Sequence, residues 1–268
     1  MTAPAPSTGA ERVPVLMYHR VDPQGAPDAL RYCVTPRRFA SHLRWLADQG
    51  WQPCTIAAFD RWFHGQAALP PRSVLITFDD GFSGVHEHAW PLLRAHGWPA
   101  TVFLVSGLIG GRDRWISQEF GTAGANALLG REQIAEMARG GIEFHSHTRT
   151  HADLSTLDDA ALAEQLHGSR HDLQALLGTA VDYLAYPFGR SSARVRAAAQ
   201  AAGYRLAFSV QPGFNRPGAD ALAVRRLDII GGDTRTRFGR KVAMGTNDGS
   251  LGHRLRYLAA RAAARLRD

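Results

Sequence analysis

The sequence of 268 residues is poor in cysteine and lysine. It has only two cysteines, Cys33 and Cys54, whose spacing matches neither a cysteine-based zinc site nor a disulfide framework. We expect both to be free structural thiols. Lys241 is the only lysine among 31 basic residues. We interpret this as a genome-wide preference for arginine and alanine, and not as a sign of phosphate binding.

Long apolar segments are also lacking. No apolar run approaches the roughly 18 residues of a membrane-spanning helix. The N-terminal segment, MTAPAPSTGAERVPVL, has neither the basic nor the apolar region of a signal peptide, and we therefore expect a cytoplasmic protein. A hydrophobic content of 45% and a charged content of 21% are ordinary for a globular chain, and the length suggests one large domain or two small ones.

Positive charge is concentrated near the C-terminus. The formal net charge is +7, and residues 235–268 alone contain nine basic and two acidic residues, so the rest of the chain is neutral. For this reason we do not expect nucleic-acid binding. Apolar residues in this segment recur at helical spacing, with arginines over much of the remaining surface; they are Leu251, Leu255, Leu258, Ala262 and Leu266. Either this helix packs on the folded body, or it lies on the anionic inner face of a membrane as a peripheral contact.

The rest of the chain alternates between apolar strands and helices. We expect strands within residues 13–21, 73–81, 100–107, 142–147, 181–189 and 204–210, and helices within 35–50, 88–97, 131–141, 158–178 and 191–203, with a loop over 110–130. Strands that are apolar on both faces are typical of a parallel α/β sheet covered by helices, and this many units favour a barrel. The expected organisation is a disordered leader over 1–11, a folded domain over 12–234 and a basic tail over 235–268.

Polar residues stand where several of these strands end; they are His19, Asp79, Asp80, His145 and His147. The carboxyl ends of barrel strands form one face, where sites are found, so we expect these side chains to converge. His147 and His151 are four positions apart, and a helical turn after the strand would put both on one side.

Two imidazoles and a carboxylate would make a catalytic zinc-type site, which usually has three protein ligands and one open position. One acid of the Asp79–Asp80 pair could bind the ion, while the other takes a proton from a water whose pKa the ion lowers to roughly 7. Simpler explanations exist for each motif alone. Asp-Asp-Gly is often a turn, and His167 and His171 have the same spacing on a polar-faced helix, where we expect no site.

The combination of motifs is more specific. TFDDGF, HTRTHADL and YPFG, in this order and preceded by PVLMYH, resemble the polysaccharide deacetylase family, the carbohydrate esterases of family 4 with a NodB homology domain. The position of the YH strand at the N-terminus resembles the arrangement in the branch of the family that contains poly-N-acetylglucosamine deacetylases. The resemblance covers about residues 13–230 and implies a distorted (β/α)7 barrel of the NodB homology type, with residues 12–234 as the catalytic domain.

The resemblance also implies roles for individual residues. Asp79 would be the general base, and Phe188 would donate its backbone N–H to the oxyanion. Asp80, His147 and His151 would bind one divalent metal ion. We expect zinc, although cobalt, nickel and iron suit the same ligands. His145 lies outside the matched motif and receives no role.

Two positions depart from the family pattern. Ala185 stands where many members have an arginine that pairs with the base, and we expect Arg226, or alternatively Arg225, to supply that charge. Many members also have a general-acid histidine in a C-terminal Leu-x-His motif. His253 matches by letters but lies in the basic tail, so we favour His19, a strand-end histidine placed at the N-terminus as a circular permutation would place it.

The expected activity is metal-dependent removal of N-acetyl groups from an amino sugar in a polysaccharide, oligosaccharide or lipid-linked glycan. Two alternatives remain open. The protein could hydrolyse another amide or an O-acetyl ester on a small molecule or lipid-linked sugar, or it could be a non-catalytic carbohydrate-binding relic. The expected partners are an N-acetylated carbohydrate and, through the tail, the inner membrane face; the sequence leaves the oligomeric state open.

Overall fold

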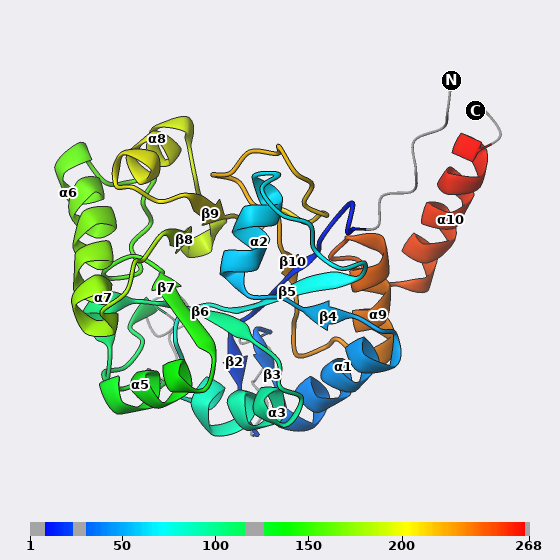
Figure 1. Ribbon diagram of the computed structural model, residues 1–268, viewed down its shortest axis with the longest axis horizontal. Coiled ribbons are helices and arrows are strands. Elements are labelled where there is room, and N and C mark those ends of the chain that lie inside the picture. Colours follow the sequence, from blue (N-terminus) through cyan, green and yellow to red (C-terminus); the bar gives the residue numbers. More distant parts are fainter. Residues whose placement is uncertain (1–8, 24–30, 116–125, 266–268) are drawn as a thin grey trace.

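A curled parallel sheet forms the centre of the molecule (Figure 1). The structure, a computed structural model, describes residues 9–23, 31–115 and 126–265, with the backbone alone for 259–265. Along the sheet, the strands in spatial order are β10 (Leu227–Asp228), β1 (Val15–Tyr18), β5 (Ser73–Phe78), β6 (Ala100–Leu104), β7 (Ile142–Ser146), β8 (Tyr183–Ala185) and β9 (Leu206–Phe208). Outside this path, β4 (Gln52–Pro53) pairs with β5, and β2 (Arg20–Val21) pairs with β3 (Cys33–Val34).

The two ends of the strand path approach each other. Phe208 of β9 forms a parallel bridge with Val224, which precedes β10 by three residues. All pairings along the path are parallel, so the carboxyl ends of the strands lie at one end of the barrel. The expected fold class, an α/β distorted seven-stranded barrel, is thereby confirmed. All residues of β5 and β6 are buried, which explains their mostly apolar sequence.

Helices surround the sheet (Figure 1). They are α1 (Pro36–Asp48), α2 (Ile56–Phe63), α3 (Trp90–Ala95), α5 (Arg131–Arg139), α6 (Asp159–Ala163), α7 (Ser169–Leu177), α8 (Ala193–Ala201), α9 (Arg235–Met244) and α10 (Leu251–Arg265). The Thr35 hydroxyl caps α1 by accepting from the Arg38 N–H at 3.3 Å, and Pro36 occupies the first turn, as the sequence predicts. The single helix expected over 158–178 is instead interrupted by a π-helical turn, Glu164–Gly168.

The folded body extends beyond the expected boundary at residue 234. Phe238 and Val242 of α9 are fully buried in the main core. Lys241 is only 3% exposed, and its Nζ donates to Oδ2 of Asp233 at 2.6 Å and to the carbonyl of Asp228 at 2.7 Å. The one lysine therefore holds α9 to the loop after β10 and adds no charge to the surface of the tail.

Other expectations concern the chain ends and the cysteines. The expected leader over 1–11 lies mostly outside the described residues, but Ala10 donates its N–H to the carbonyl of Leu69 at 2.7 Å. Cys33 and Cys54 are buried and form no disulfide, as expected. No helix within the described residues combines the length and apolar character needed to cross a membrane.

Replacing Lys241 tests its role in the fold. Lys241→Met leaves the buried Asp233 carboxylate without its cation, so the free energy of unfolding in urea should fall by about 3–5 kcal/mol. Arg139→Met, at an exposed position that ends α5, is the control and should change it by no more than about 0.5 kcal/mol. Equal losses in the two variants would contradict this role for Lys241.

Candidate metal and catalytic site

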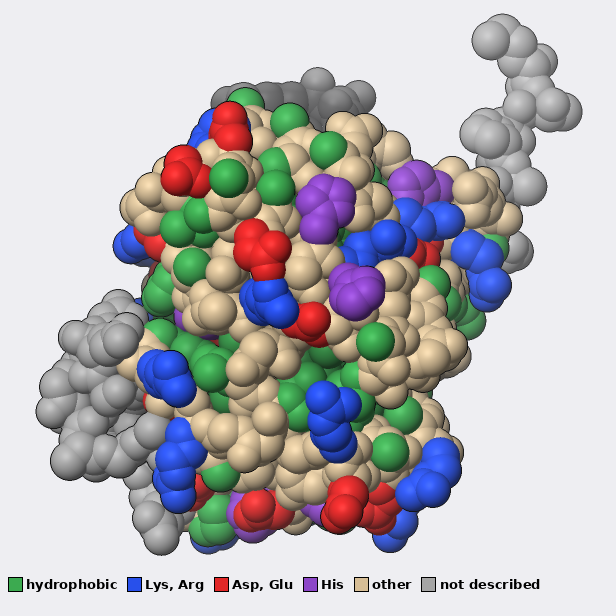
Figure 2. Space-filling view, turned by 90° about the vertical axis from the view of Figure 1, so that its left-hand side faces the viewer, with side chains coloured by type: hydrophobic (Ala, Val, Ile, Leu, Met, Phe, Trp, Pro, Cys, Tyr) green, Lys and Arg blue, Asp and Glu red, His purple; other side chains and the backbone are tan. Residues whose placement is uncertain are grey.

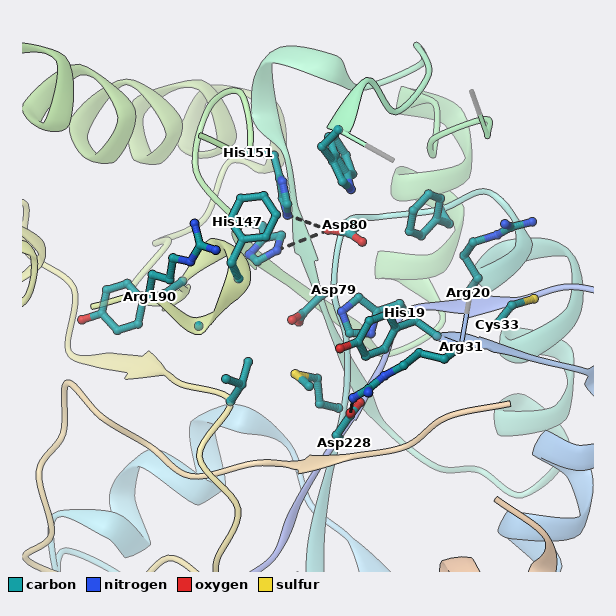
Figure 3. Close-up of a pocket in the computed structure, with 18 of the residues that line it drawn as sticks. His19, Arg20, Arg31, Cys33, Asp79, Asp80, His147, His151, Arg190 and Asp228 are labelled. Atoms are coloured by element: carbon teal, nitrogen blue, oxygen red, sulfur yellow. Dashed lines mark hydrogen bonds and ion pairs between the residues drawn. The ribbon is translucent and has the colours of Figure 1, made fainter. Parts of the chain in front are cut away.

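The polar strand ends meet around one pocket with a volume of about 400 Å³ (Figure 3). Tyr18 of β1 is paired with Phe78 of β5, so His19 and Asp79 follow neighbouring strands at the same level. Six of the seven residues predicted to form the site line the pocket; they are His19, Asp79, Asp80, His147, His151 and Phe188. Segments that are far apart in the sequence therefore converge as expected.

Arg226, the seventh residue, is fully buried beside Asp79. Its Nη1 donates to Oδ1 of Asp79 at 2.7 Å and its Nη2 donates to Oδ2 at 2.8 Å, a two-bond pairing that suits a guanidinium and a carboxylate. Its Nε donates to the carbonyl of Ser209 at 2.9 Å, which fixes the guanidinium plane. The alternative, Arg225, is exposed and donates to the carbonyl of Pro212. The structure therefore pairs the base candidate with Arg226.

This pair controls the charge of Asp79. Burial alone would raise the pKa of Asp79, but the charges of Arg226 and His147 and the hydrogen bonds from Arg226 outweigh burial and hold that pKa below its ordinary value. Asp79 is therefore ionised at neutral pH. Each of its oxygens keeps a second lone pair, so the carboxylate can still accept a proton from a molecule in the pocket.

The backbone turns sharply between the two acids. Asp80 and Gly81 both have positive φ, 73° and 74°. A Cβ at Gly81 would lie 2.7 Å from Cδ2 of Leu104, so only glycine fits there. As a result Asp79 faces Arg226, whereas Asp80 points to the two histidines (Figure 3).

Asp80, His147 and His151 form a buried cluster suited to a metal ion. The Nε2 atoms of His147 and His151 lie 3.3 and 3.2 Å from Oδ1 of Asp80. Neither contact has hydrogen-bond geometry, so this buried oxygen has no hydrogen-bond partner among the described residues. One potential ligand atom from each residue lies within 4.8 Å of the others. An unsatisfied carboxylate oxygen facing two imidazole nitrogens fits a divalent ion with two histidine ligands and one carboxylate ligand.

The orientation of His147 also fits ligation. Its Nδ1 lies 2.8 Å from the carbonyl of Ala185, and because a carbonyl can only accept, Nδ1 carries the proton and Nε2 presents a lone pair to the cluster. Burial lowers the pKa of His147, but the neighbouring Asp80 and Asp79 outweigh it and raise that pKa; the pKa of His151 is lowered by burial. Burial likewise raises the pKa of Asp80, but both imidazoles more than compensate and lower it.

The two histidines do not reach each other through a helical turn, so that premise of the sequence analysis is wrong. Residues 147–153 form an irregular loop, in which Thr148 and His151 have positive φ, 68° and 60°. The loop is held by the π-helical turn, where Oε1 of Gln165 accepts the N–H groups of Arg149 at 3.2 Å and Thr150 at 2.9 Å. Side-chain periodicity could not predict this arrangement, because the left-handed backbone sets the direction of His151.

Backbone strain is concentrated at this site. Of the five non-glycine residues with positive φ in the described chain, four belong to the site segments; they are Asp80, Thr148, His151 and Phe188. Such conformations cost free energy and persist where the surrounding structure enforces them, often at active sites.

Phe188 lies in the 3₁₀ turn Pro187–Gly189 after β8, with φ 58°. Its backbone N–H donates to none of the described residues, and its ring packs edge-on to His151 at 4.8 Å between centroids. A Cβ at Gly189 would meet the side chain of Val210 at 2.3 Å, so glycine lets this turn approach the segment that follows β9. The turn therefore leaves a hydrogen-bond donor beside the ligand cluster.

The two candidates for the general acid lie in different places. His19 lines the pocket, its ring contacts Tyr32 at 4.6 Å, and its buried Nδ1 has no partner among the described residues. His253 lies on α10 beside Asp248, and it is not among the residues that line the pocket. The geometry therefore favours His19.

Other histidines behave as expected. His167 and His171 are exposed on the helical segment and join no cluster of potential metal ligands among the described residues. His145 lies beneath the site against Tyr183, at 4.5 Å between ring centroids, and burial lowers its pKa to about 3.

Several further residues line the pocket that were not predicted from the sequence. Trp115 stacks on the His151 ring at 4.1 Å, and Asn247 lies between α9 and α10. Arg31 donates to Oδ2 of Asp228 at 2.7 Å across another part of the pocket. Only Asp228 had a signal in the sequence, since it lies two positions after Arg226 in the segment AVRRLDII. The remaining residues lie in loops without a local pattern.

Comparisons with known proteins agree with this geometry. A family model described as polysaccharide deacetylase matches residues 66–207, just over half of the chain. The poly-β-1,6-N-acetyl-D-glucosamine N-deacetylase of Staphylococcus epidermidis is 28% identical over 235 residues, covering 79% of this chain and 77% of that protein.

Solved structures share the fold. IcaB from Ammonifex degensii superposes with a TM-score of 0.72 at 28% identity, covering 88% of this chain and 97% of that chain. The Streptococcus pyogenes deacetylase PplD, solved in complex with acetate, gives a TM-score of 0.71 at 24% identity over 84% of this chain and 95% of that chain. The chain belongs to the polysaccharide deacetylase family, whose members are hydrolases that act on the N-acetyl groups of sugars.

Proposed function

We propose that the protein deacetylates an N-acetylglucosamine-containing glycan, using a divalent ion held by Asp80, His147 and His151. The observation that carries the proposal is the separation of two carboxylates in one pocket, one paired with a buried arginine and one facing two imidazoles. The name of the staphylococcal relative supports the substrate class. Zinc is the proposed ion, because three protein ligands with an open position are typical of catalytic zinc.

The residues divide the work of amide hydrolysis. A divalent ion at the cluster would polarise the acetyl carbonyl and acidify a water molecule. Asp79 accepts a proton from the attacking water while the oxygen of that water forms a bond to the acetyl carbon. The Phe188 N–H donates to the oxygen of the tetrahedral intermediate. His19 then gives a proton to the leaving nitrogen as the carbon–nitrogen bond breaks, which releases acetate and a free amine.

Arg226 is a positioning residue in this scheme. It keeps Asp79 ionised and fixes the orientation of the carboxylate through two hydrogen bonds. It is fully buried and is not among the residues that line the pocket, so it touches Asp79 from outside the pocket. Asp79 is therefore free to act on a proton while Asp80 serves as ligand.

Metal binding and activity can be tested together. Metal-replete protein should release acetate from β-1,6-linked N-acetylglucosamine oligomers, and a chelator should stop the release. His151→Ala should lose both the ion, measured by elemental analysis, and the activity. His171→Ala is the matched control, because it removes an exposed histidine with the same sequence spacing, and it should keep both.

Two results would contradict the proposal. If both variants retain the ion, His151 is not a ligand. If the metal-replete protein releases acetate from O-acetyl esters but not from the N-acetylated oligomers, the reaction is ester hydrolysis.

The general acid can be separated from the other groups by comparing leaving groups. An amine needs a proton to depart, whereas an alkoxide needs less assistance. His19→Ala should therefore lower kcat on an N-acetyl substrate by about 10²–10⁴-fold and on a matched O-acetyl substrate by much less, with metal content unchanged. His253→Ala is the control and should match the wild type on both. Equal slowing of both substrates by His19→Ala would argue against proton donation by His19.

A further inference from the structure

The described side chains of the C-terminal helix α10 are mostly exposed. It packs against α9 at its start and then extends away from the barrel (Figure 1). Leu251, Leu255 and Leu258 are 58%, 67% and 49% exposed. The contact with α9 therefore leaves these three leucines largely uncovered by the described residues.

These leucines are the exposed large hydrophobic residues of the described structure that lie outside the catalytic pocket. The described residues include six exposed large hydrophobic side chains, and three of them, Tyr32, Phe188 and Val210, line the catalytic pocket. The other three are the leucines of α10. Exposed apolar side chains that gather in one place commonly mark a binding surface.

The leucines recur three and four positions apart, so they share one side of the helix, and the sequence continues the row with Ala262. Arg254 and Arg256 are exposed between them. The helix contains no acidic residue, and three further arginines follow at 261, 265 and 267. An apolar row combined with one sign of charge is the composition of helices that lie in a bilayer interface.

The basic surface continues onto the neighbouring helices. One hollow beside α9, the helix that α10 contacts, is lined by exposed arginines. They are Arg37 and Arg44 of α1 and Arg235 of α9. By contrast, acidic and basic side chains are interspersed on the face that α6 and α7 help to cover (Figure 2). Exposed arginines of α1 therefore lie on the same side of the molecule as α9, where the charge of Arg235 is paired with that of Asp48.

We propose that α10 docks this protein on the surface of an anionic lipid bilayer, with the leucines in the headgroup region and the arginines at the lipid phosphates. Such a surface offers an apolar environment to the leucines and negative charge to the arginines. A nucleic acid would pair with the arginines but would leave the leucines in water. A second copy of α10 would cover the leucines, but it would bring two all-basic helices together without the opposite charges that usually flank such a contact.

The docking surface adjoins the catalytic pocket. Asn247 lines the pocket, and its Oδ1 accepts the N–H of Asp228 at 2.8 Å. Leu251 follows four residues later, so a chain of at most about 14 Å joins them. Docking through α10 would therefore hold the pocket close to the bilayer surface, whichever acyl group the enzyme removes.

Sedimentation with vesicles tests the proposal on the full chain. The protein should pellet with vesicles containing phosphatidylglycerol at low salt, much less at high salt, and not with phosphatidylcholine alone. Leu251→Gln/Leu255→Gln keeps the charge and should weaken binding at least tenfold. Arg254→Gln/Arg256→Gln should weaken it similarly at low salt. Because all four side chains are exposed, these variants should keep wild-type unfolding midpoints and acetate release from short oligomers.

The matched control is Arg131→Gln/Arg139→Gln, which removes the same charge from exposed positions on α5 and should bind as the wild type does. Three outcomes would overturn the proposal. The wild type could stay in the supernatant at low salt. The leucine variant could bind phosphatidylglycerol vesicles as tightly as the wild type. The wild type could be a dimer by analytical ultracentrifugation that the leucine variant converts to monomer without any effect of lipid.

Discussion

The ion pair between Asp79 and Arg226 is the interaction on which the rest of the site depends. Both side chains are almost completely buried, and a charge buried without a partner is strongly destabilising. Two hydrogen bonds of 2.7 and 2.8 Å satisfy the pair and tie the end of β5 to the segment that leads into β10. The same contact that helps to close the barrel thus fixes the orientation and the charge of the proposed base.

A second constraint is the left-handed backbone around the pair. Positive φ at Asp80 turns its carboxylate away from Arg226, and positive φ at His151 turns its imidazole back toward Asp80. Adjacent acids consequently have different partners, one a guanidinium and the other two imidazoles. This division lets one pocket hold a metal ion and keep an ionised base beside it.

Much of this arrangement could be predicted from the sequence, because parallel strands place their carboxyl ends together. The apolar runs before His19, Asp79 and His147 were sufficient to predict that these residues meet. Ala185, which stands where many family members have an arginine, pointed to Arg226 or Arg225 as the substitute, and the structure pairs Arg226 with Asp79. Local patterns did not reveal the left-handed loop after His147 or the π-helical turn that supports it. They also did not predict that α9 is part of the core, since its buried Lys241 looks like an ordinary basic residue until Asp233 is placed beside it.

A double-mutant cycle on kcat tests most directly whether Arg226 acts through Asp79. Asp79→Asn should keep the metal ion and lower kcat by about 10²–10⁴-fold, because the amide cannot accept a proton. Arg226→Lys should lower kcat in the wild-type background, since a lysine cannot form both hydrogen bonds, and should have little further effect when Asp79 is already asparagine. If Arg226→Lys lowers kcat by the same factor in both backgrounds, or if Asp79→Asn retains half of the wild-type rate, the ion pair does not have the role that this account assigns to it.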